Sequence, residues 1–536
     1  MKRIVSFIFY IFATFIAIAQ EQEYIHLTTD KDCYLAGEDL WLKICVSDKD
    51  NQPLDISKVA YIEVGDPQQV YAQAKIDLTN GMGNGRIRLP RTMHSGTFQL
   101  TAYTRYMRNW GEEAYHRKLI AVINTLQSSE DDQIVWTDSL SETTAFTSQK
   151  LSTDQKKYHQ RSRVSLSWKD MPINAFGLSL SVVRKDYILG PVPVPILPTD
   201  VGPTIAHFWV PESEGHIISA KTVQEKVALR ASRLGCVGKD IRLFEGKEEA
   251  NGTYSYYTHG IYNQQDIAID AVVKHPTDNA RMEIVSPFIN IQPKSLPTLQ
   301  LYSREESLQE RSVNMQIQAL WPDSIHNASL IESLYHFTPD ISYNLDEWTR
   351  FSSVRETLVE FVMGIHVTKR NGETLMQLLK EDTKKFSNFK ALVLIDGVPI
   401  ENHEQALDFD ARLLHYIHQY QGGYTFGGQV YDGIISMITH KGTLNGLRLA
   451  ENSTLLTYEF PQKNRVFLAP VYETDEQKTS RMPDSRHTLY WHPYLNQESG
   501  SLEFYTSDMK GTYVVTLTGY TSQGGKWEEK MEFIVQ

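Results

Sequence analysis

The chain has 536 residues, a formal net charge of −12 and three cysteines, and 41% of its residues are hydrophobic. That length predicts three or four packed domains, because one domain takes roughly 100–200 residues. The negative charge argues against nucleic acid and anionic membrane surfaces as partners, and 28 tyrosines with few long helical patterns favour a mainly β fold.

Residues 1–19 have the pattern of a secretory signal peptide. Lys2 and Arg3 form the positive start, residues 4–18 form the apolar core, and the Ala-Ile-Ala of 17–19 fits a small-x-small cleavage site. We therefore predict an exported chain, periplasmic or associated with the outer membrane; an uncleaved anchor is the alternative. No later run approaches the ~20 apolar residues of a spanning helix, so no transmembrane helix is expected in the mature chain.

Residues 20–126 predict a first β-sandwich. Alternating runs are separated by turn signals such as Ala36-Gly37 and Asn80-Gly81, at the spacing typical of sandwich strands. The expected strands are Tyr24–Leu27, Asp39–Val46, Val59–Val64, Val70–Ile76, Gly85–Leu89, Thr97–Tyr103 and Leu119–Asn124.

Short motifs in this segment resemble the MG2 domain of macroglobulins. Residues 29–41 (TDKDCYLAGEDLW) are similar to the family pattern TDKxxYxPGE, with Ala36 in place of proline, and residues 95–104 (SGTFQLTAYT) are similar to a later strand of that domain. The resemblance implies a macroglobulin-like sandwich. Protease trapping is not expected, because that activity depends on a thioester motif of the CxEQ type, which none of the three cysteines fits.

The cysteines are predicted to be buried apolar side chains. A tight turn at 35–37 would leave Cys33 and Cys45 at positions of the hairpin that do not face each other, so a disulfide between them is not expected. The spacings of these two and Cys236 fit no metal cluster.

The sequence RYMRNW at 105–110 follows a strand directly, and we predict that it is exposed. Aromatic and arginine side chains are common anchors of protein interfaces. Arg105, Tyr106, Arg108 and Trp110 are therefore predicted to form an interaction surface.

The middle of the chain is again β-rich. Residues 127–158 are polar and predict a linker, and residues 159–298 predict a β-sandwich region that begins with strands at Arg163–Trp168 and Gly177–Val183. The opening Gly215–Lys221 of its later part resembles a carboxypeptidase-regulatory-like domain. A polar connector, 299–334, follows, with a strand indicated at Val313–Ala319.

Residues 335–446 predict a small α/β domain. A helix is expected over Asn344–Met363, and it should pack on the strands through apolar residues that recur every three or four positions. A strand at Gly364–Lys369 and a hairpin turn at Arg370-Asn371-Gly372 come next. The apolar face of the helix consists of Trp348, Phe351, Val354, Leu358 and Phe361.

The most informative stretch is 391–442. It predicts a buried strand at Ala391–Ile395, a turn at Asp396–Pro399, a helix capped by Asp410, a glycine-rich loop and a second buried strand at Gly433–Thr439.

The sequences LIDGVP (394–399), GYTFG (423–427) and DGIISMIT (432–439) resemble the plug domain of TonB-dependent outer-membrane receptors. The resemblance implies a plug-like domain without its own barrel, since the remaining residues, 447–536, predict only a C-terminal β-sandwich. The positions that match the family motif are Asp396, Gly397, Pro399, Gly427, Gly433 and Thr439. The strands expected after them are Ser453–Phe460, Thr488–Trp491, Gly500–Thr506, Gly511–Tyr520 and Lys526–Val535.

No catalytic, cofactor or metal site is predicted. The chain has no HExxH, GxSxG or CxxC motif. His415 and His418 lie three apart on the predicted helix, a spacing that suits a metal pair but is also common by chance. Asp396 and Asp432 look like a carboxylate pair, yet both lie at predicted turns, where backbone hydrogen bonding explains them better.

The sequence therefore predicts a mainly β fold with several immunoglobulin- or macroglobulin-like β-sandwiches plus one small α/β plug-like domain. The expected function is that of a non-enzymatic exported protein of the Gram-negative envelope, an accessory or docking component of an outer-membrane transport or assembly complex. Its partner would be an outer-membrane β-barrel or another envelope protein. A stand-alone glycan- or peptide-binding protein is the alternative, and an enzyme with an unrecognised site is a third hypothesis.

Overall fold

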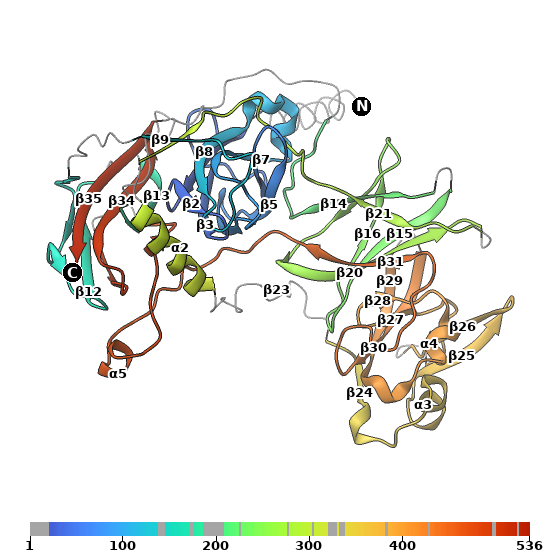
Figure 1. Ribbon diagram of the computed structural model, residues 1–536. Coiled ribbons are helices and arrows are strands. Elements are labelled where there is room, and N and C mark those ends of the chain that lie inside the picture. The colour runs from blue at the N-terminus through green and yellow to red at the C-terminus, as the bar shows by residue number, and fades with distance from the viewer. Residues whose placement is uncertain are drawn as a thin grey trace, which may run out of the picture. The chain divides into compact units, whose positions relative to one another are not determined.

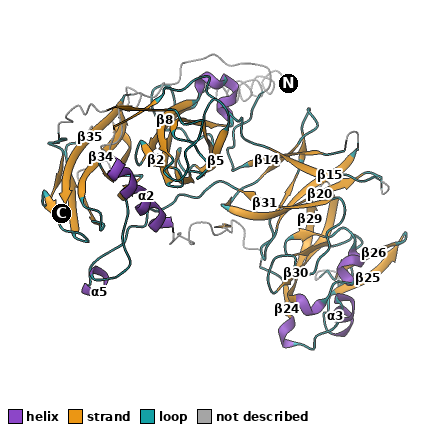
Figure 2. Ribbon diagram, viewed as in Figure 1, coloured by secondary structure: helices purple, strands orange, loops and turns teal. Residues whose placement is uncertain are grey.

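The computed structural model describes residues 21–137, 145–171, 175–185, 208–224, 227–275, 278–302, 305–319, 330–331, 338–380, 384–426, 429–495, 500–521 and 525–536. Strands dominate and helices are few and short, which confirms the mainly β fold class (Figure 2). The chain forms two compact units: unit 1 holds 1–213, 288–327 and 461–536, and unit 2 holds 214–287 and 328–460.

Unit 1 begins with the predicted first sandwich, and all seven expected strands are present. Its two sheets enclose a core of apolar side chains, among them Leu42, Ile62 and Phe98. One sheet has the order β1-β3-β6 and the other β2-β8-β7-β4-β5. The strands are β1 Tyr24–Thr29, β2 Cys33–Leu35, β3 Asp39–Ser47, β4 Val59–Gly65, β5 Val70–Asp77, β6 Met82–Arg88, β7 Gly96–Thr104 and β8 His116–Ile123.

A second sandwich in unit 1 joins the middle of the chain to its C-terminal part. Strand β12 (Arg163–Trp168) pairs with β33 (Gly500–Tyr505), and β13 (Ala175–Arg184) lies between β32 (Thr488–His492) and β34 (Gly511–Thr521). The expected 159–298 region therefore contributes strands to two different sandwiches. The sheets are completed by β10 Leu151–Thr153, β11 Lys157–Tyr158 and β35 Lys526–Val535.

The strand indicated at Val313–Ala319 is wrong, because these residues end a helix, α2 (Glu305–Ala319). Leu308, Arg311, Ser312 and Met315 are all buried and recur at helical spacing. Because two of these four buried residues, Arg311 and Ser312, are polar, the helical period is not visible as an apolar pattern in the sequence. Beside α2, β22 (Leu299–Tyr302) pairs in parallel with β9 (Ile134–Thr137), a strand within the expected linker.

Unit 2 contains a third sandwich. Strand β31 (Ser453–Glu459) comes from the C-terminal part of the chain, yet it pairs along its whole length with β20 (Gln264–Val273), as Figure 1 shows. The sheet orders are β17-β18-β14-β21 and β16-β15-β20-β31. The other strands are β14 Ile217–Thr222, β15 Leu229–Cys236, β16 Leu243–Glu245, β17 Lys247–Glu248, β18 Tyr254–Tyr257 and β21 Met282–Val285.

The rest of unit 2 is a small α/β module built on the sheet β24-β29-β30-β27-β28. The buried strands β27 (Leu392–Ile395) and β30 (Gln429–Thr439) run in parallel. The predicted hairpin at Asn371-Gly372 is confirmed, with positive φ at both residues. The remaining elements are β24 Ile341–Asn344, α3 Val354–Glu360, β25 Ile365–Arg370, β26 Glu373–Leu378, β28 Val398–Pro399, α4 His403–Leu407 and β29 Leu414–Phe426.

One predicted helix of this module is wrong, and another is shorter than expected. Asp410 caps only a short 3-10 turn, and the residues after it form β29. A register shift between Leu414 and Tyr416 places Leu414 and Ile417 on the buried side, three residues apart, and so imitates a helical period. The helix expected over Asn344–Met363 is reduced to α3, because Ser353 caps a new start.

Among the described residues, no helix has both the length and the apolar character needed to cross a membrane.

Candidate functional site

The plug-like motif of the α/β module converges on a buried carboxylate. The side chain of Asp396 accepts hydrogen bonds from Thr439 N at 2.7 Å, from Thr439 Oγ1 at 2.6 Å and from Leu444 N at 2.8 Å. These bonds tie the turn after β27 to the end of β30. The prediction that backbone hydrogen bonding explains Asp396 is thereby confirmed.

The backbone angles of the turn at Asp396-Gly397 restrict which residue types can stand there. Asp396 and Gly397 have φ angles of 44° and 79°, as a two-residue hairpin turn demands. A Cβ on Gly397 would lie 2.5 Å from the carbonyl oxygen of Cys236, so only glycine fits. Pro399 pairs with Leu394 in the short strand that follows.

The motif residues therefore build the scaffold. Gly433 has φ of 100°, and a Cβ there would lie 2.4 Å from Leu378 Cδ1. Gly427 lies outside the described residues. Asp432 lies at the opposite end of β30 from Thr439 and binds Ser387 and Lys380, so it does not form a pair with Asp396.

One group of apolar side chains around α3 is here called the aromatic patch. It consists of the exposed Trp348, Val359 and Met363 and the half-buried Phe351 and Phe361. The Trp348 ring stacks on the Phe361 ring with centroids 4.6 Å apart and planes 6° apart. Trp348, Val359 and Met363 expose 48%, 79% and 76% of their surface. Large apolar side chains gathered at one exposed place mark an interaction site more often than scattered ones do.

The local sequence explains why this patch faces outward. Val354, Leu358 and Val362 pack into the module's core. The residues one position further on, Val359 and Met363, must then face away from it. Of the predicted inner face, Val354 and Leu358 are buried and Phe361 packs partly against the same core, whereas Trp348 is exposed, because α3 begins only after Ser353. The helix cap Ser352-Ser353 is the sequence signal that could have distinguished the inward-facing side chains from the outward-facing ones.

Within residues 344–363, the charged side chains that have no ion pair with another described residue are acidic. Arg350 pairs with Asp346, and Arg355 pairs with Glu404 and Asp408. Glu347, Glu356 and Glu360 are exposed, and none has an ion pair with another described residue. We call these three glutamates the acidic rim.

No metal site is predicted at His415 and His418, and the helix expected to carry them is a strand. The register shift between Leu414 and Tyr416 interrupts the alternation of side chains here, and the Tyr416 ring lies between the two histidine rings, with centroids 4.0 Å from His415 and 5.3 Å from His418. His415 also stacks on His440, with ring centroids 5.2 Å apart. Each histidine Nε2 faces the Asp346 carboxylate, at 3.3 Å and 3.1 Å respectively.

The contacts of His415 and His440 with Asp346 hold the short turn Leu345–Glu347, which leads directly into Trp348. Partial burial and the nearby His440, Lys239 and Arg350 together lower the pKa of His415. Across the described part of the chain, no group of three or more histidine, cysteine, aspartate and glutamate side chains is arranged to hold a metal ion.

The predicted exposure of Arg105, Tyr106, Arg108 and Trp110 is wrong. The segment Tyr106–Trp110 is a 3-10 turn, in which Tyr106 is 1% and Trp110 5% exposed. Their rings belong to the core of the first sandwich and meet edge to face at 5.0 Å. Both arginines lie over the Trp209 ring, with guanidinium carbons 5.1 Å and 4.7 Å from its centroid. The turn folds the aromatic side chains back onto the sandwich instead of presenting them to solvent.

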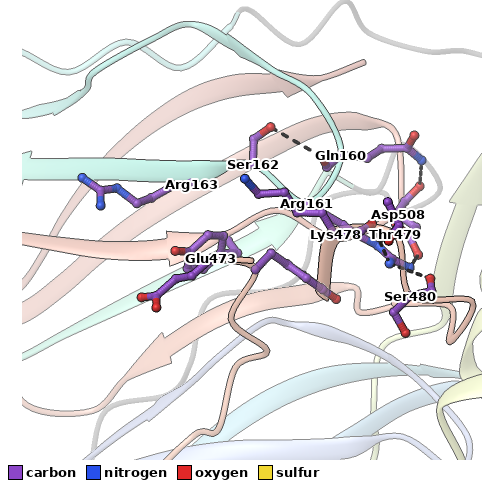
Figure 3. Close-up of a pocket in the computed structure, with 11 residues that line it drawn as sticks. Gln160, Arg161, Ser162, Arg163, Glu473, Lys478, Thr479, Ser480 and Asp508 are labelled. Atoms are coloured by element: carbon purple, nitrogen blue, oxygen red, sulfur yellow. Dashed lines mark hydrogen bonds and ion pairs between the residues drawn. The ribbon is translucent and has the colours of Figure 1, made fainter. Parts of the chain in front are cut away.

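Unit 1 has an open polar pocket of about 680 Å³ beside the second sandwich (Figure 3). Its central side chain, Arg161, donates to both Asp508 oxygens at 2.7 Å and 2.6 Å. The same guanidinium donates to the carbonyl oxygens of Ser480 and Met482 at 2.7 Å and 2.8 Å. Because Arg161 is fully engaged in holding the 477–482 segment, we interpret the pocket as part of a structural clamp.

Residues of the MG2-like motif at 29–41 also have structural roles. Asp30 is buried and accepts hydrogen bonds from Tyr34 in its own sandwich and from Thr488 in the second one. Glu38 pairs with Lys31 at 3.0 Å and with Arg311 of α2 at 3.1 Å. Burial alone would raise the pKa of Glu38, but these two cations outweigh it and hold it well below its usual range.

All three cysteines are buried, as predicted, and none of these described residues is in a disulfide. Burial raises the pKa of Cys236 to about 12 and also raises that of Cys45. Both thiols therefore stay protonated and pack as small apolar groups.

No protein-family model and no curated protein sequence matches this chain. Solved structures similar to it include Escherichia coli alpha-2-macroglobulin in its native conformation, with 10% identity and a TM-score of 0.24 over 96% of this chain and 40% of that one. Salmonella alpha-2-macroglobulin reacted with methylamine gives 12% identity and 0.17, over 96% and 23%. Latent PorU from Porphyromonas gingivalis gives 8% and 0.16, over 96% and 34%. The chain thus spans less than half the length of these structures.

Proposed function

We propose that the chain is a non-enzymatic exported protein of the Gram-negative envelope, and that its α/β module is a plug-like domain that docks on an outer-membrane partner. The partner would be a β-barrel or another component of a transport or assembly complex. The observation that carries the proposal is the aromatic patch, which lies on the same module as the plug-like motif.

The scaffold around the patch favours binding over chemistry. The motif residues Asp396 and Thr439 satisfy one another inside the module. This leaves a rigid support for exposed side chains, and rigid aromatic anchors lose little entropy on binding. The signal-peptide pattern of residues 1–19 supports export.

A pull-down from detergent-solubilised native envelope tests the proposal. The bait is the tagged full chain, compared with a patch variant (Trp348→Ser, Val359→Ser, Met363→Ser) and a matched control (Phe389→Ser, Val430→Ser, Leu455→Ser). The control removes three side chains of unit 2 that are also about half exposed. Mass spectrometry should find a stoichiometric outer-membrane protein with wild type and control, and lose it with the patch variant.

A chain recovered alone, or a partner that stays bound to the patch variant, would overturn the proposal. Recovery alone would favour the stand-alone glycan- or peptide-binding hypothesis.

A further inference from the structure

We propose that the aromatic patch binds a protein segment in which apolar side chains are flanked by lysine or arginine. This inference rests on the docking role proposed above and names the chemistry of the partner. It joins two observations: the apolar centre around the stacked Trp348 and Phe361, and the acidic rim formed by Glu347, Glu356 and Glu360.

The centre of the patch is held in shape before any partner binds. Trp348 lies flat on Phe361, and the Phe351 ring is 6.3 Å from the same ring. Tyr343 fixes the end of the segment, because its hydroxyl accepts a hydrogen bond from Met363 N at 3.0 Å. An apolar side chain of a partner would meet a formed surface, which reduces the entropy lost on binding.

The rim gives the patch its charge preference. Each of its glutamates lies next to the patch in sequence or on the same helix: Glu347 precedes Trp348, and Glu360 lies between Val359 and Phe361. Glu356 lies one turn before them on α3. The arginines of this segment are already paired with acids, so they do not offset the charge of the three glutamates. Glu347 and Glu356 accept hydrogen bonds from the neutral side chains of Asn344 and Ser352, which leave the negative charge in place. Complementary charges at a rim favour one class of partner and slow the approach of others.

The same charges argue against two other occupants. An anionic lipid surface would bring negative headgroups against the rim. A second copy in a two-fold interface would bring the same acidic rim against itself, and the whole chain carries a formal charge of −12.

The test is a selection of short random peptides displayed on phage, with the full chain as bait. We expect the selected peptides to place lysine or arginine beside aromatic or branched apolar residues, and we expect the patch variant to select none of them. For a synthetic peptide of the selected sequence, the double variant Glu347→Gln, Glu360→Gln should weaken binding by about fivefold, the range of two exposed charge pairs. The control variant Glu245→Gln, Glu283→Gln changes two exposed acids elsewhere in unit 2 and should leave affinity unchanged.

Selected peptides without basic enrichment would overturn the inference, as would equal affinity for the Glu347→Gln, Glu360→Gln variant or patch-dependent binding to anionic vesicles. If the envelope partner still depends on the patch in the pull-down, the docking role survives without this charge preference. If basic peptides bind the patch but no envelope partner is recovered, the docking role is wrong and the chemistry of the patch stands.

Discussion

Two aromatic segments of this protein differ in their exposure to solvent. Tyr106 and Trp110 follow a strand and are buried in the first sandwich, whereas Trp348 precedes a helix and is half exposed. In the first segment, distant side chains such as Trp209 lie against the turn. In the second, Val354 and Leu358 occupy the inner positions, and Trp348 stacks from outside on a partly buried Phe361. Whether an aromatic cluster is core or surface is thus decided by what else packs there, and the following substitutions test that contrast.

The largest effect is expected from Trp110→Ala. Removing a buried indole should lower the free energy of unfolding by about 3–5 kcal/mol, through lost apolar burial and the cavity left behind. Urea unfolding monitored by circular dichroism measures it. A loss below about 1 kcal/mol would mean that the side chain is not part of the core.

Asp396→Ala should cost somewhat less, about 2–4 kcal/mol, because it leaves Thr439 N and Leu444 N without their buried acceptor and strains a residue with positive φ. Asp396→Asn keeps an acceptor and tolerates this backbone, so its loss should be smaller. The control Asp432→Ala removes a carboxylate near the start of β30 that binds Ser387 and Lys380. Equal losses for Asp396→Ala and Asp432→Ala would contradict the buried role of Asp396.

Trp348→Ser should change stability by less than about 1 kcal/mol, because this side chain is half exposed. Envelope-partner capture should nevertheless fall. Thermal unfolding and the pull-down, run on the same preparation, separate the two effects. A large loss of stability would mean that Trp348, like Trp110, is part of a hydrophobic core.

The smallest effect is a pH dependence at the turn before Trp348. Because partial burial and the neighbouring His440, Lys239 and Arg350 lower the pKa of His415, the folded turn favours the neutral ring. The folded turn should be most stable above the unfolded pKa of about 6.5 and lose stability as the pH falls below it. Hydrogen exchange of residues 344–350, corrected for intrinsic rates, should therefore show less protection at pH values below 6.5 than above.

His415→Gln should reduce this pH dependence, whereas His418→Gln should retain it, because the histidines whose Nε2 atoms face Asp346 are His415 and His440. Unchanged protection across the range in the wild type would show that the histidines do not hold the turn.

Local rules predicted much of the fold. The strands of the first sandwich, the Asn371-Gly372 hairpin and the Asp396-Gly397 turn follow from alternation and from residues that tolerate positive φ. Local rules failed where a bulge or a buried polar residue disturbed the pattern. The bulge at Leu414–Tyr416 made a strand resemble a helix, and Arg311 concealed the period of α2.

The candidate site was predicted only in part. The motif residues around Asp396 were identified, but they proved to be scaffold, and Trp348 and Phe351 of the aromatic patch were assigned to the packed face of a helix. The helix cap at Ser353 decides their direction, and it is a weak signal beside a run of apolar residues.

The β character, the turns and the buried strands of the module follow from the sequence alone, since these depend on neighbouring residues. Strand pairing across hundreds of residues, as of β12 with β33 and of β20 with β31, follows only from the folded chain. The same holds for which aromatic side chains face solvent. Both depend on contacts between segments far apart in the chain, and alternation within one strand does not specify its partner.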